Sequence, residues 1–318
     1  MSLKFIYVLI SGENDYYAEQ ALVSMHSLRL HNPDAHIVLV TDDRTLISMT
    51  GHRALIKSYI NELVTVNPPA DFTPVQRSRF LKTTLRQTLS GDFLYIDNDT
   101  IVTGTLDELD RLDCEVGAVP DCHAPARLNW QLNKYLETTK KEYWGTDIYF
   151  NGGILLVRDT VNAARLFLDW HTIWNEERVA YGVSIDQPSL SQADLRNDFL
   201  IRPIADKFNC QIVKPRSRKF MLDARIVHYS AESPRGNFFP LKRKEWLNII
   251  REEGINEEVE AIVLQPIISY LEHADIMSRD DLKKYEAPMV TLALKLSRDF
   301  PWTNKMAKLL YKMFGYEI

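Results

Sequence analysis

The sequence predicts an α/β fold: a mostly parallel, mixed sheet flanked by helices, with a helical appendage at the C-terminus. Short apolar, β-branched runs bounded by turn residues alternate with helical patterns through the first two thirds of the 318 residues. Such runs are typical of strands buried on both faces of a sheet. After about residue 245 the strand signals end and helical patterns follow. We therefore expect an α/β domain over residues 1–245 and a helical region over residues 246–318.

The individual elements follow from the same patterns. Phe5–Ile10 and His36–Thr41 are apolar and β-branched, and Ala18–Leu30 between them has helical spacing, so the three segments predict a β-α-β unit. Further strands are expected at Leu63–Val66, Phe93–Ile96, Gly117–Pro120, Gly153–Val157 and Arg225–Tyr229, and helices at Gln76–Leu89 and Asn162–Trp174. The helices expected near the C-terminus are Glu257–His273, Arg279–Tyr285, Val290–Phe300 and Asn304–Phe314.

Composition excludes several classes of protein. Hydrophobic residues make up 45% and charged residues 25%, which excludes a disordered chain and a small disulfide scaffold. The 12 glycines form neither of the common phosphate loops, G-x-x-x-x-G-K-[ST] and G-x-G-x-x-G. The net charge of -5 gives no overall reason to bind nucleic acid. The chain has three cysteines and no C-x-x-C pair, and it shows neither a signal-peptide pattern nor a long apolar run. We therefore expect a soluble, cytoplasmic protein.

Two carboxylates follow the predicted strand Phe93–Ile96. Asp97 and Asp99 are spaced i, i+2, and Ile101 and Val102 then resume the apolar pattern. Ligands of open α/β sheets bind beyond the carboxyl ends of the strands. Two acidic side chains there favour a divalent-cation site that also holds a diphosphate. The alternative is a surface turn, which Asp and Asn favour for local reasons, although the apolar flanks argue against it.

His228 follows a second strand signal, and a histidine in such a place is usually structural. Between residues 214 and 244, however, nine basic and two acidic residues give a local charge of +7. This concentration attracts anions, and phosphates are the natural candidates for Arg and Lys side chains. A plain solvated basic face is the alternative. RNA is a poorer interpretation, because few aromatic residues are interleaved for stacking.

With these residues in place, the chain resembles glycosyltransferase family 8, a retaining galactosyl- and glucosyltransferase family with a GT-A fold. The resemblance covers roughly residues 4–245. Asp97-Asn98-Asp99 is similar to the family's D-x-D, which implies Asp97 and Asp99 as metal ligands and places Asp97 and Asn98 against the donor. His228 matches the family's late histidine, the third protein ligand. An imidazole beside two carboxylates favours Mn²⁺, with Mg²⁺ as the alternative.

Other segments extend the resemblance. Phe150–Val157 is similar to the family's F-N-[SA]-G-V-L-L-I, so Asn151 is implied to contact the donor sugar. Asp186-Gln187 resembles the D-Q-x-x-L element, which implies that Asp186 binds sugar hydroxyls and that Gln187 lies beside the anomeric carbon. The remaining donor-binding residues implied by the resemblance are Ile10, Ser11, Asn14, Thr41, Asp42, Arg79, Lys82, Gly236 and Lys242.

The chain departs from the family pattern after His228. The family's compact H-x-x-G-x-x-K is replaced by a longer run, which leaves Lys242 and Arg235 as alternatives for the diphosphate contact. Local explanations also exist for single motifs. Asn151-Gly152-Gly153 also fits a tight turn, Asp186 before a proline fits a helix cap, and Arg79 fits a solvent-facing position.

These residues predict a metal-dependent enzyme that moves a hexose from a UDP-sugar to a hydroxyl of a glycan or lipid-linked saccharide, with retention at the anomeric carbon. Retention in the family is usually described as a same-face internal return that needs no strong nucleophile. Two alternatives stay open: a nucleotidyltransferase that makes sugar nucleotides, and a non-catalytic nucleotide- or carbohydrate-binding protein.

The C-terminal residues 301–318 combine lysines with aromatic and apolar residues. As a helix, they would place the apolar side chains on one face and the lysines largely on the other. Basic amphipathic helices can lie on anionic membranes, so this segment predicts peripheral contact with the inner face of the membrane. A helix packed on the domain is the alternative.

Overall fold

The computed structural model describes residues 3–142, 147–212, 222–229 and 239–266, together with residues 288, 292, 296, 300, 302, 303 and 306. The chain divides into two compact units, Met1–His273 and Ala274–Ile318. Within the part of the chain that is described, no helix is both long and apolar enough to cross a membrane.

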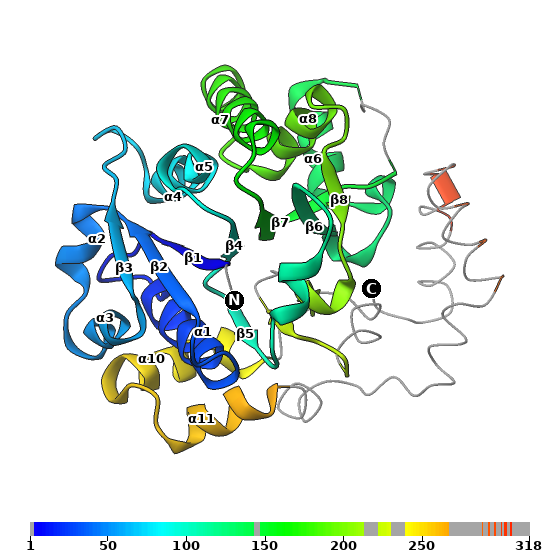
Figure 1. Ribbon diagram of the computed structural model, residues 1–318. Coiled ribbons are helices and arrows are strands. Elements are labelled where there is room, and N and C mark those ends of the chain that lie inside the picture. The colour runs from blue at the N-terminus through cyan, green and yellow to red at the C-terminus, as the bar shows by residue number, and fades with distance from the viewer. Residues whose placement is uncertain are drawn as a thin grey trace. The chain divides into compact units, whose positions relative to one another are not determined.

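A seven-stranded sheet forms the centre of the first unit (Figure 1). Its strands, in spatial order, are β3 (Glu62–Thr65), β2 (His36–Thr41), β1 (Lys4–Leu9), β4 (Phe93–Ile96), β7 (Phe150–Val157), β6 (Val116–Pro120) and β8 (Ile201–Pro203). Strand β7 pairs antiparallel with β4 and β6, and the other pairs are parallel. The predicted mixed, mostly parallel sheet is therefore confirmed.

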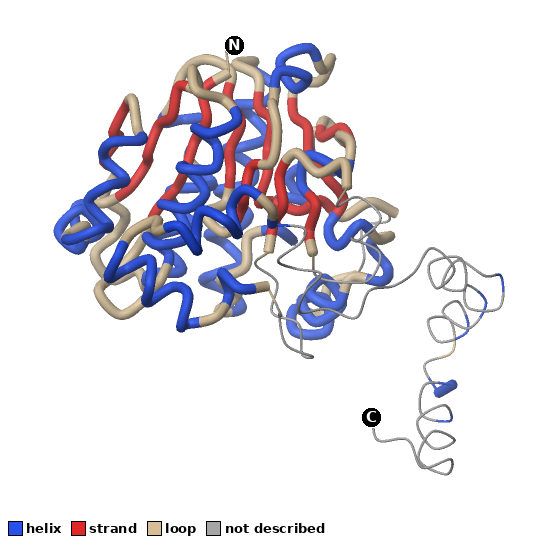
Figure 2. The backbone as a smooth tube through the Cα atoms, turned by 90° about the horizontal axis from the view of Figure 1, so that it is seen from below, coloured by secondary structure: helices blue, strands red, loops and turns tan. Residues whose placement is uncertain are grey.

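Helices cover both faces of this sheet (Figure 2). Alternate strand residues such as Val8 and Phe93 pack in one apolar cluster with Leu81, Trp170 and Leu190, which belong to helices on that face. Tyr7 points to the opposite face, where its hydroxyl lies 3.0 Å from Ser24 Oγ on α1. Successive side chains of a strand point to opposite faces of the sheet. Because helices cover both faces, the side chains on both are mostly apolar, which explains the continuous apolar runs.

The described helices have the following bounds: α1 Tyr17–His31, α2 Asp43–Ser48, η1 Gly51–Leu55, α3 Ile56–Tyr59, α4 Pro74–Thr83, α5 Leu85–Thr88, η2 Asp107–Arg111, η3 Asp121–His123, η4 Ala126–Leu128, α6 Trp130–Thr139, α7 Val161–Tyr181, α8 Gln187–Arg196, η5 Asp206–Asn209, η7 Pro240–Lys242, α10 Lys244–Glu253 and α11 Glu257–Leu264. Helices α10 and α11 belong to the first unit: Arg251 Nε lies 2.7 Å from Glu19 Oε1, and His26 Nε2 lies 2.5 Å from Glu260 Oε2.

Two predicted helices differ from the structure. The segment expected as one helix over Gln76–Leu89 is divided at Thr84, where the Thr83 and Thr84 hydroxyls donate to carbonyls three and four residues back and compete with the helical pattern. Helix α11 ends at Leu264, because Gln265 precedes a proline and has left the helical conformation, and residues 267–273 of the predicted helix Glu257–His273 lie outside the described residues. The other predicted C-terminal helices lie outside the described residues, apart from isolated positions.

A second, three-stranded sheet lies at the carboxyl end of β4. Its order is β5 (Thr100–Val102), β10 (Ile226–His228) and β9 (Cys210–Gln211). Strands β5 and β10 are antiparallel, with His228 opposite Thr100. Strand β9 runs parallel to β10, with Cys210 beside Val227. This small sheet brings together residues that are more than a hundred positions apart in the chain.

Candidate active site

The Asp97-Asn98-Asp99 segment links β4 to β5 in a defined conformation. Asp97 N donates to the Gly153 carbonyl at 2.8 Å, and the Thr100 hydroxyl donates to the Asp97 carbonyl at 2.9 Å. The Asn98 side chain donates to the Val8 carbonyl on β1, also at 2.9 Å. These bonds satisfy backbone groups at the junction of two sheets. Both carboxylates lie beyond the end of the central strand, where Asp97 Oδ1 also accepts from the Tyr95 hydroxyl.

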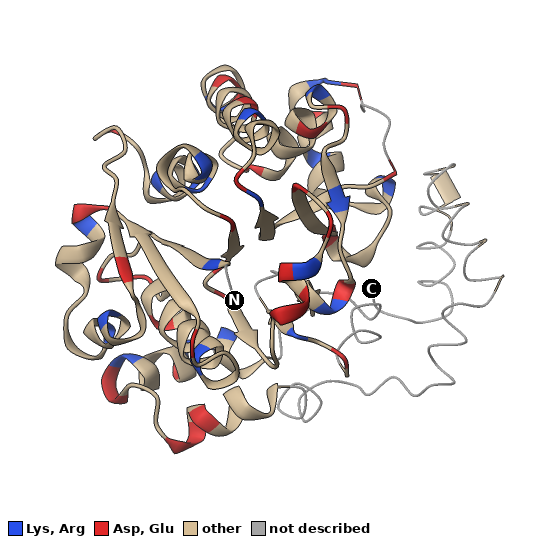
Figure 3. Cartoon of the chain, viewed as in Figure 1, with Lys and Arg blue, Asp and Glu red and all other residues tan. Residues whose placement is uncertain are grey.

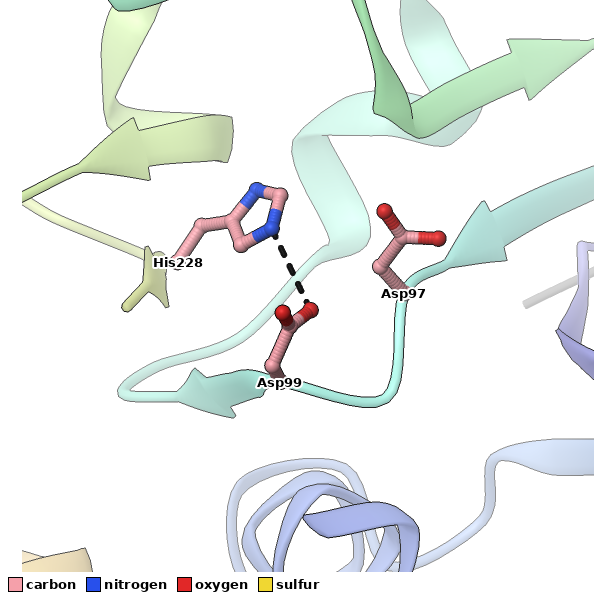
Figure 4. Close-up of side chains that lie close together, drawn as sticks. All are labelled: Asp97, Asp99 and His228. Carbon is pink, nitrogen blue, oxygen red and sulfur yellow. Dashed lines mark ion pairs between the residues drawn. The ribbon is translucent and has the colours of Figure 1, made fainter. Parts of the chain in front are cut away.

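Asp97, Asp99 and His228 converge on one point (Figure 4). One potential ligand atom from each residue lies within 4.8 Å of the other two. The antiparallel register of β5 and β10 places His228 beside this turn, and Tyr229 N donates to the Asp99 carbonyl at 3.1 Å. His228 is only 4% exposed, and its Nε2 lies 3.3 Å from Asp99 Oδ1. The three predicted metal ligands are thus brought together.

The chemistry of this cluster fits a divalent cation. Burial lowers the pKa of His228, but the charges of Asp99 and Asp97 more than offset it and leave the pKa above its ordinary value. Burial likewise opposes the ionised form of Asp99, yet His228 and Lys242 hold its pKa below the ordinary value. His228 Nε2 is buried and makes no hydrogen bond within the described part of the chain. An imidazole nitrogen without a hydrogen bond, facing two carboxylates, is a donor set suited to a transition-metal dication.

Strand β7 approaches the cluster so closely that only glycine fits at Gly153. A Cβ atom at this position would lie 2.5 Å from His228 Cε1 and 2.7 Å from Asp97 Oδ2. The Asn151-Gly152-Gly153 segment is therefore part of an extended buried strand, and the tight-turn interpretation of it is wrong. Its glycine allows the backbone of β7 to pass beneath the three ligands.

Charged residues of α4 meet the beginning of α8 next to this cluster. Asp186 precedes α8 and is 4% exposed, but its side chain does not cap the helix. It instead forms ion pairs, with its Oδ1 2.9 Å from Arg79 Nε and its Oδ2 3.3 Å from Lys82 Nζ. Lys82 is itself buried and lies 3.5 Å from Asp97 Oδ1, above the ring of Tyr95. Asp186 does occupy the N-cap position of α8, as the helix-cap alternative predicts, but its side chain pairs with Arg79 and Lys82, and the solvent-facing alternative for Arg79 is wrong.

The pKa of Asp186 reflects these neighbours. Burial alone would raise it, but the charges of Arg79 and Lys82 hold it below the ordinary value. The carbonyl of Asp186 accepts from Trp170 Nε1 at 2.8 Å, which fixes the backbone at this point. The result is a row of alternating, buried and half-buried charges that reaches from α8 to the three predicted metal ligands.

Asn151 connects this row to further polar groups. Its Nδ2 donates to Asp121 Oδ1 at 2.7 Å and faces Gln187 Oε1 at 3.4 Å, while its Oδ1 accepts from Gly153 N at 2.8 Å. Gln187 Nε2 is buried without a hydrogen-bond partner among the described residues. We did not predict a role for Asp121, although it follows a predicted strand in the same way that Asp97 follows Phe93–Ile96.

A cavity of about 150 Å³ opens beside the cluster. It is lined by residues of β1 and the loop after it, the first turn of α1, the first turns of α4 and the end of β4: Val8, Ile10, Tyr17, Gln20, Pro74, Val75, Ser78, Arg79, Tyr95, Asp97, Asn98 and Asp99. Predicted donor-binding residues thus meet at one cavity beyond the carboxyl ends of β1 and β4, which is where α/β sheets bind ligands.

Other predicted donor-binding residues have structural partners outside this lining. Ser11 is buried, and its hydroxyl donates to Asp15 Oδ1 at 2.6 Å, whereas Asn14 is exposed. The Thr41 hydroxyl donates to the Leu9 carbonyl at 2.7 Å. Asp42 caps α2 by accepting from Thr45 N at 2.9 Å, and its other oxygen pairs with Arg77. Contact of these four residues with a donor stays a prediction.

The basic window, residues 214–244, lies mostly outside the described residues, as do Gly236 and Arg235. Lys242 is described: it ends η7, is partly buried and acts on the pKa of Asp99. Figure 3 shows acidic and basic residues interspersed along the described elements. The charge of the window as a whole is therefore known from the sequence alone.

Comparison with known proteins identifies a matching family model and similar folds. Residues 8–233 match the family model described as glycosyl transferase family 8. The chain matches no curated protein sequence. It is similar in structure to galactosyltransferase LgtC in complex with donor and acceptor sugar analogues, with 16% identity, a TM-score of 0.52, and 81% of this chain and 99% of that chain covered.

Two further solved structures are similar. For the glycosyltransferase GlyE of Streptococcus pneumoniae TIGR4, the identity is 18% and the TM-score 0.50, with 87% of this chain and 66% of that chain covered. For mouse xyloside xylosyltransferase 1, the identity is 14% and the TM-score 0.48, with 74% and 99% covered. At these identities the likeness to LgtC and GlyE shows a shared fold, and it confirms the predicted GT-A type.

Proposed function

The chain belongs to glycosyltransferase family 8, and we therefore propose that this glycosyltransferase moves a hexose from a UDP-sugar to an acceptor hydroxyl with retention at the anomeric carbon. The observation that carries the proposal is the convergence of Asp97, Asp99 and His228 at the cavity beyond β4. A diphosphate donor needs its negative charge offset where the bond to the sugar breaks. Half-buried carboxylates beside a buried imidazole nitrogen are ligands suited to such a cation site.

We propose Mn²⁺ as the cation, held by Asp97, Asp99 and His228. The imidazole ligand favours Mn²⁺ over Mg²⁺, which prefers oxygen ligands and retains water. When bound, the cation supplies Lewis-acid stabilisation of the departing diphosphate. The carboxylates and His228 Nε2 hold it at the end of β4, and Gly153 leaves the space that they need.

The protein's own cations assist at the same place. Lys82 Nζ is buried within 3.5 Å of Asp97, and Arg79 lines the cavity. Fixed positive groups in a site with little water stabilise the charge that develops on a leaving group. Asp186 orients both cations and, in the proposed reaction, accepts hydrogen bonds from sugar hydroxyls.

Gln187 and Asn151 occupy the sugar side of the site in this proposal. Asn151 Nδ2 lies 3.4 Å from Gln187 Oε1, so the two amides orient each other. An amide is too weak a nucleophile to form a stable glycosyl adduct. It can stabilise positive charge at the anomeric carbon while the acceptor hydroxyl attacks from the face that UDP leaves and gives its proton to the departing diphosphate, which accounts for retention.

The acceptor that we propose is a saccharide, free or lipid-linked. Contact with the inner face of a membrane through residues 301–318 is part of the same proposal, because a lipid-linked acceptor lies at that surface. Almost all of this segment lies outside the described residues, so its support comes from the basic, amphipathic sequence.

The test is release of UDP from UDP-glucose, UDP-galactose and UDP-GlcNAc, with and without Mn²⁺. We expect Mn²⁺-dependent release from one of the hexose donors and its loss in Asp97→Asn, which keeps the size of the side chain but removes its charge. Glu176→Gln, an exposed position on α7, is the matched control and should retain activity. Unchanged turnover in Asp97→Asn would refute the role of Asp97 as a metal ligand. No UDP release from any of the three donors would refute the proposed function. Product detection is needed because a non-catalytic binder would also be stabilised by UDP and Mn²⁺.

A further inference from the structure

The side chain behind His228 is Asn209, the last residue of η5. Asn209 is 0% exposed, and its Oδ1 lies 2.9 Å from His228 Nδ1. Its Nδ2 lies 2.9 Å from Asn151 Oδ1. Strand β9 begins at the next residue and runs parallel to β10, which places Asn209 beside the imidazole. One buried amide thus contacts both a metal-binding histidine and a residue on the sugar side of the site.

Hydrogen bonds link Asp121, Asn151, Asn209 and His228 in that order. One backbone group determines which atom donates in each of them. Gly153 N–H can only donate, and it lies 2.8 Å from Asn151 Oδ1, so this atom is an oxygen that accepts. Asn209 must then face Asn151 with its amino group and face His228 with its oxygen. The other end agrees, since Asn151 Nδ2 lies 2.7 Å from a carboxylate oxygen of Asp121.

The tautomer of His228 is the consequence. Because Asn209 Oδ1 accepts, the proton of the neutral imidazole is on Nδ1. The lone pair of Nε2 then faces Asp97 and Asp99, as a metal ligand requires. Asn209 and His228 are both buried, so water competes poorly for these bonds. A histidine that ligates a metal usually has its other nitrogen held in this way.

We propose that Asn209 is the positioning residue of the cation site. It holds His228 in the Nδ1–H tautomer, with Nε2 towards the two carboxylates, and it joins the cation site to the sugar-side amide of Asn151. The inference rests on the proposed function only for the identity of the cation. It extends the site by a residue that no D-x-D or late-histidine motif contains.

The first test reads the tautomer directly in the wild-type protein. With ¹⁵N-labelled histidine and no metal, the two ring nitrogens of His228 have distinct chemical shifts at a pH where the ring is neutral. His228→Gln identifies the signals by removing them. We expect the proton on Nδ1 in the wild type. A proton on Nε2 would overturn the proposal without any variant of Asn209.

The second test measures Mn²⁺ affinity without a donor, by electron paramagnetic resonance of the free ion. Asn209→Leu has a similar size but neither polar atom, and we expect its Kd for Mn²⁺ to rise about 10- to 100-fold. Asn209→Asp restores an acceptor for His228 but faces Asn151 Oδ1 with a second acceptor, so it should recover only part of the loss. Asn32→Leu is the matched control: Asn32 is another buried asparagine, bonded to Leu106 N and the Gly104 carbonyl, and its loss should leave Mn²⁺ affinity unchanged.

The outcomes separate this proposal from the proposed function. Suppose that Asn209→Leu folds and binds Mn²⁺ as tightly as the wild type, while Asp97→Asn loses Mn²⁺ binding. This result would refute the positioning role and support the metal site. Dependence of Mn²⁺ affinity on Asn209 without turnover of any UDP-sugar would keep the positioning role and refute the function. If Asn209→Leu does not fold, the tautomer of His228 in the wild type still decides.

Discussion

Gly153 and His228 are packed so closely that a single methyl group between them cannot be accommodated. A Cβ atom on Gly153 would lie 2.5 Å from His228 Cε1, well inside van der Waals contact. The two residues belong to different sheets, β7 of the central sheet and β10 of the small one. Their contact is where the two sheets meet, and the position of the imidazole in the predicted metal-ligand cluster depends on it.

Gly153→Ala should therefore displace His228 or Asp97 and weaken Mn²⁺ binding by at least about tenfold, a loss comparable to that from misplacing a ligand. Gly152→Ala is the matched control. Its Cβ would lie 3.4 Å from Lys82 Nζ and 3.6 Å from Gln187 Cγ, which is ordinary contact, so Mn²⁺ affinity should persist. Titration of both variants with Mn²⁺ checks this, and equal affinities would contradict it.

Helix α10 should stabilise the loop after β1 through Arg251. This side chain donates to Glu19 Oε1 and the Asp15 carbonyl and lies over the ring of Tyr16, while Arg53 also pairs with Glu19. Because Arg251 is 30% exposed and Glu19 retains Arg53, Arg251→Met should cost only about 1 kcal/mol of unfolding free energy. Urea unfolding measures the loss. Lys244→Met, an exposed position at the start of the same helix, should cost less.

The loss in Arg251→Met should depend on pH. Burial opposes the ionised form of Glu19, but its bonds to Arg251 and Arg53 bring its pKa below the ordinary 4.5. A lowered folded-state pKa contributes stability that is present above the unfolded value and lost as pH falls through the folded one. The difference in unfolding free energy between the wild type and Arg251→Met should shrink below about pH 4.5. A difference independent of pH would contradict this account.

Asp194 should destabilise the protein at neutral pH. It is 6% exposed, and burial raises its pKa from 3.8 to about 6, despite the hydrogen bond from Ile201 N at 2.8 Å and the charge of Arg202. The folded state then binds more protons than the unfolded state between these values, so stability falls as pH rises from 3.8 to about 6. Asp194→Asn can still accept from Ile201 N. Its unfolding free energy should exceed that of the wild type by about 1–3 kcal/mol at neutral pH and should equal it below pH 3.8. Chemical unfolding across the window is the measurement, and equal stability at neutral pH would refute it.

Removal of metal should abolish turnover without unfolding the protein. The apolar cluster under the central sheet packs independently of the three ligands, so circular dichroism should be unchanged after treatment with EDTA. Added Mn²⁺ should restore activity and raise the melting temperature, as any ligand of the native state does. Neither effect of Mn²⁺ is expected in Asp97→Asn. A melting temperature in Asp97→Asn that responds to Mn²⁺ as in the wild type would place the cation elsewhere.

Much of the fold follows from local patterns. The strands His36–Thr41 and Phe93–Ile96 lie where the apolar runs predict them, because strands buried on both faces leave a continuous signal. Asp97 and Asp99 are detectable for the same reason: they follow such a run directly. Asp121 likewise follows a predicted strand directly, Gly117–Pro120, but we did not predict a role for it in the site.

Asn209 carries no such signal. It precedes β9, a strand of only two residues, which is too short to show a pattern, and its partners lie 19 and 58 positions away in the chain. Lone asparagines are common in turns, so nothing nearby in the sequence separates this one from the others. Its role depends on which side chains lie on its two sides.

The sequence by itself determined the alternation of strands and helices, the place of two carboxylates at the end of a buried strand, and the family. These properties depend on residues that are neighbours along the chain, where hydrophobic periodicity and motif spacing act. Tertiary structure alone decided that β5 and β10 pair so that His228 meets Asp99, that Gly153 must lack a side chain, and that Asn209 and Asn151 set the imidazole tautomer. Each of these depends on distances between segments far apart in sequence, which packing fixes to within a few tenths of an ångström.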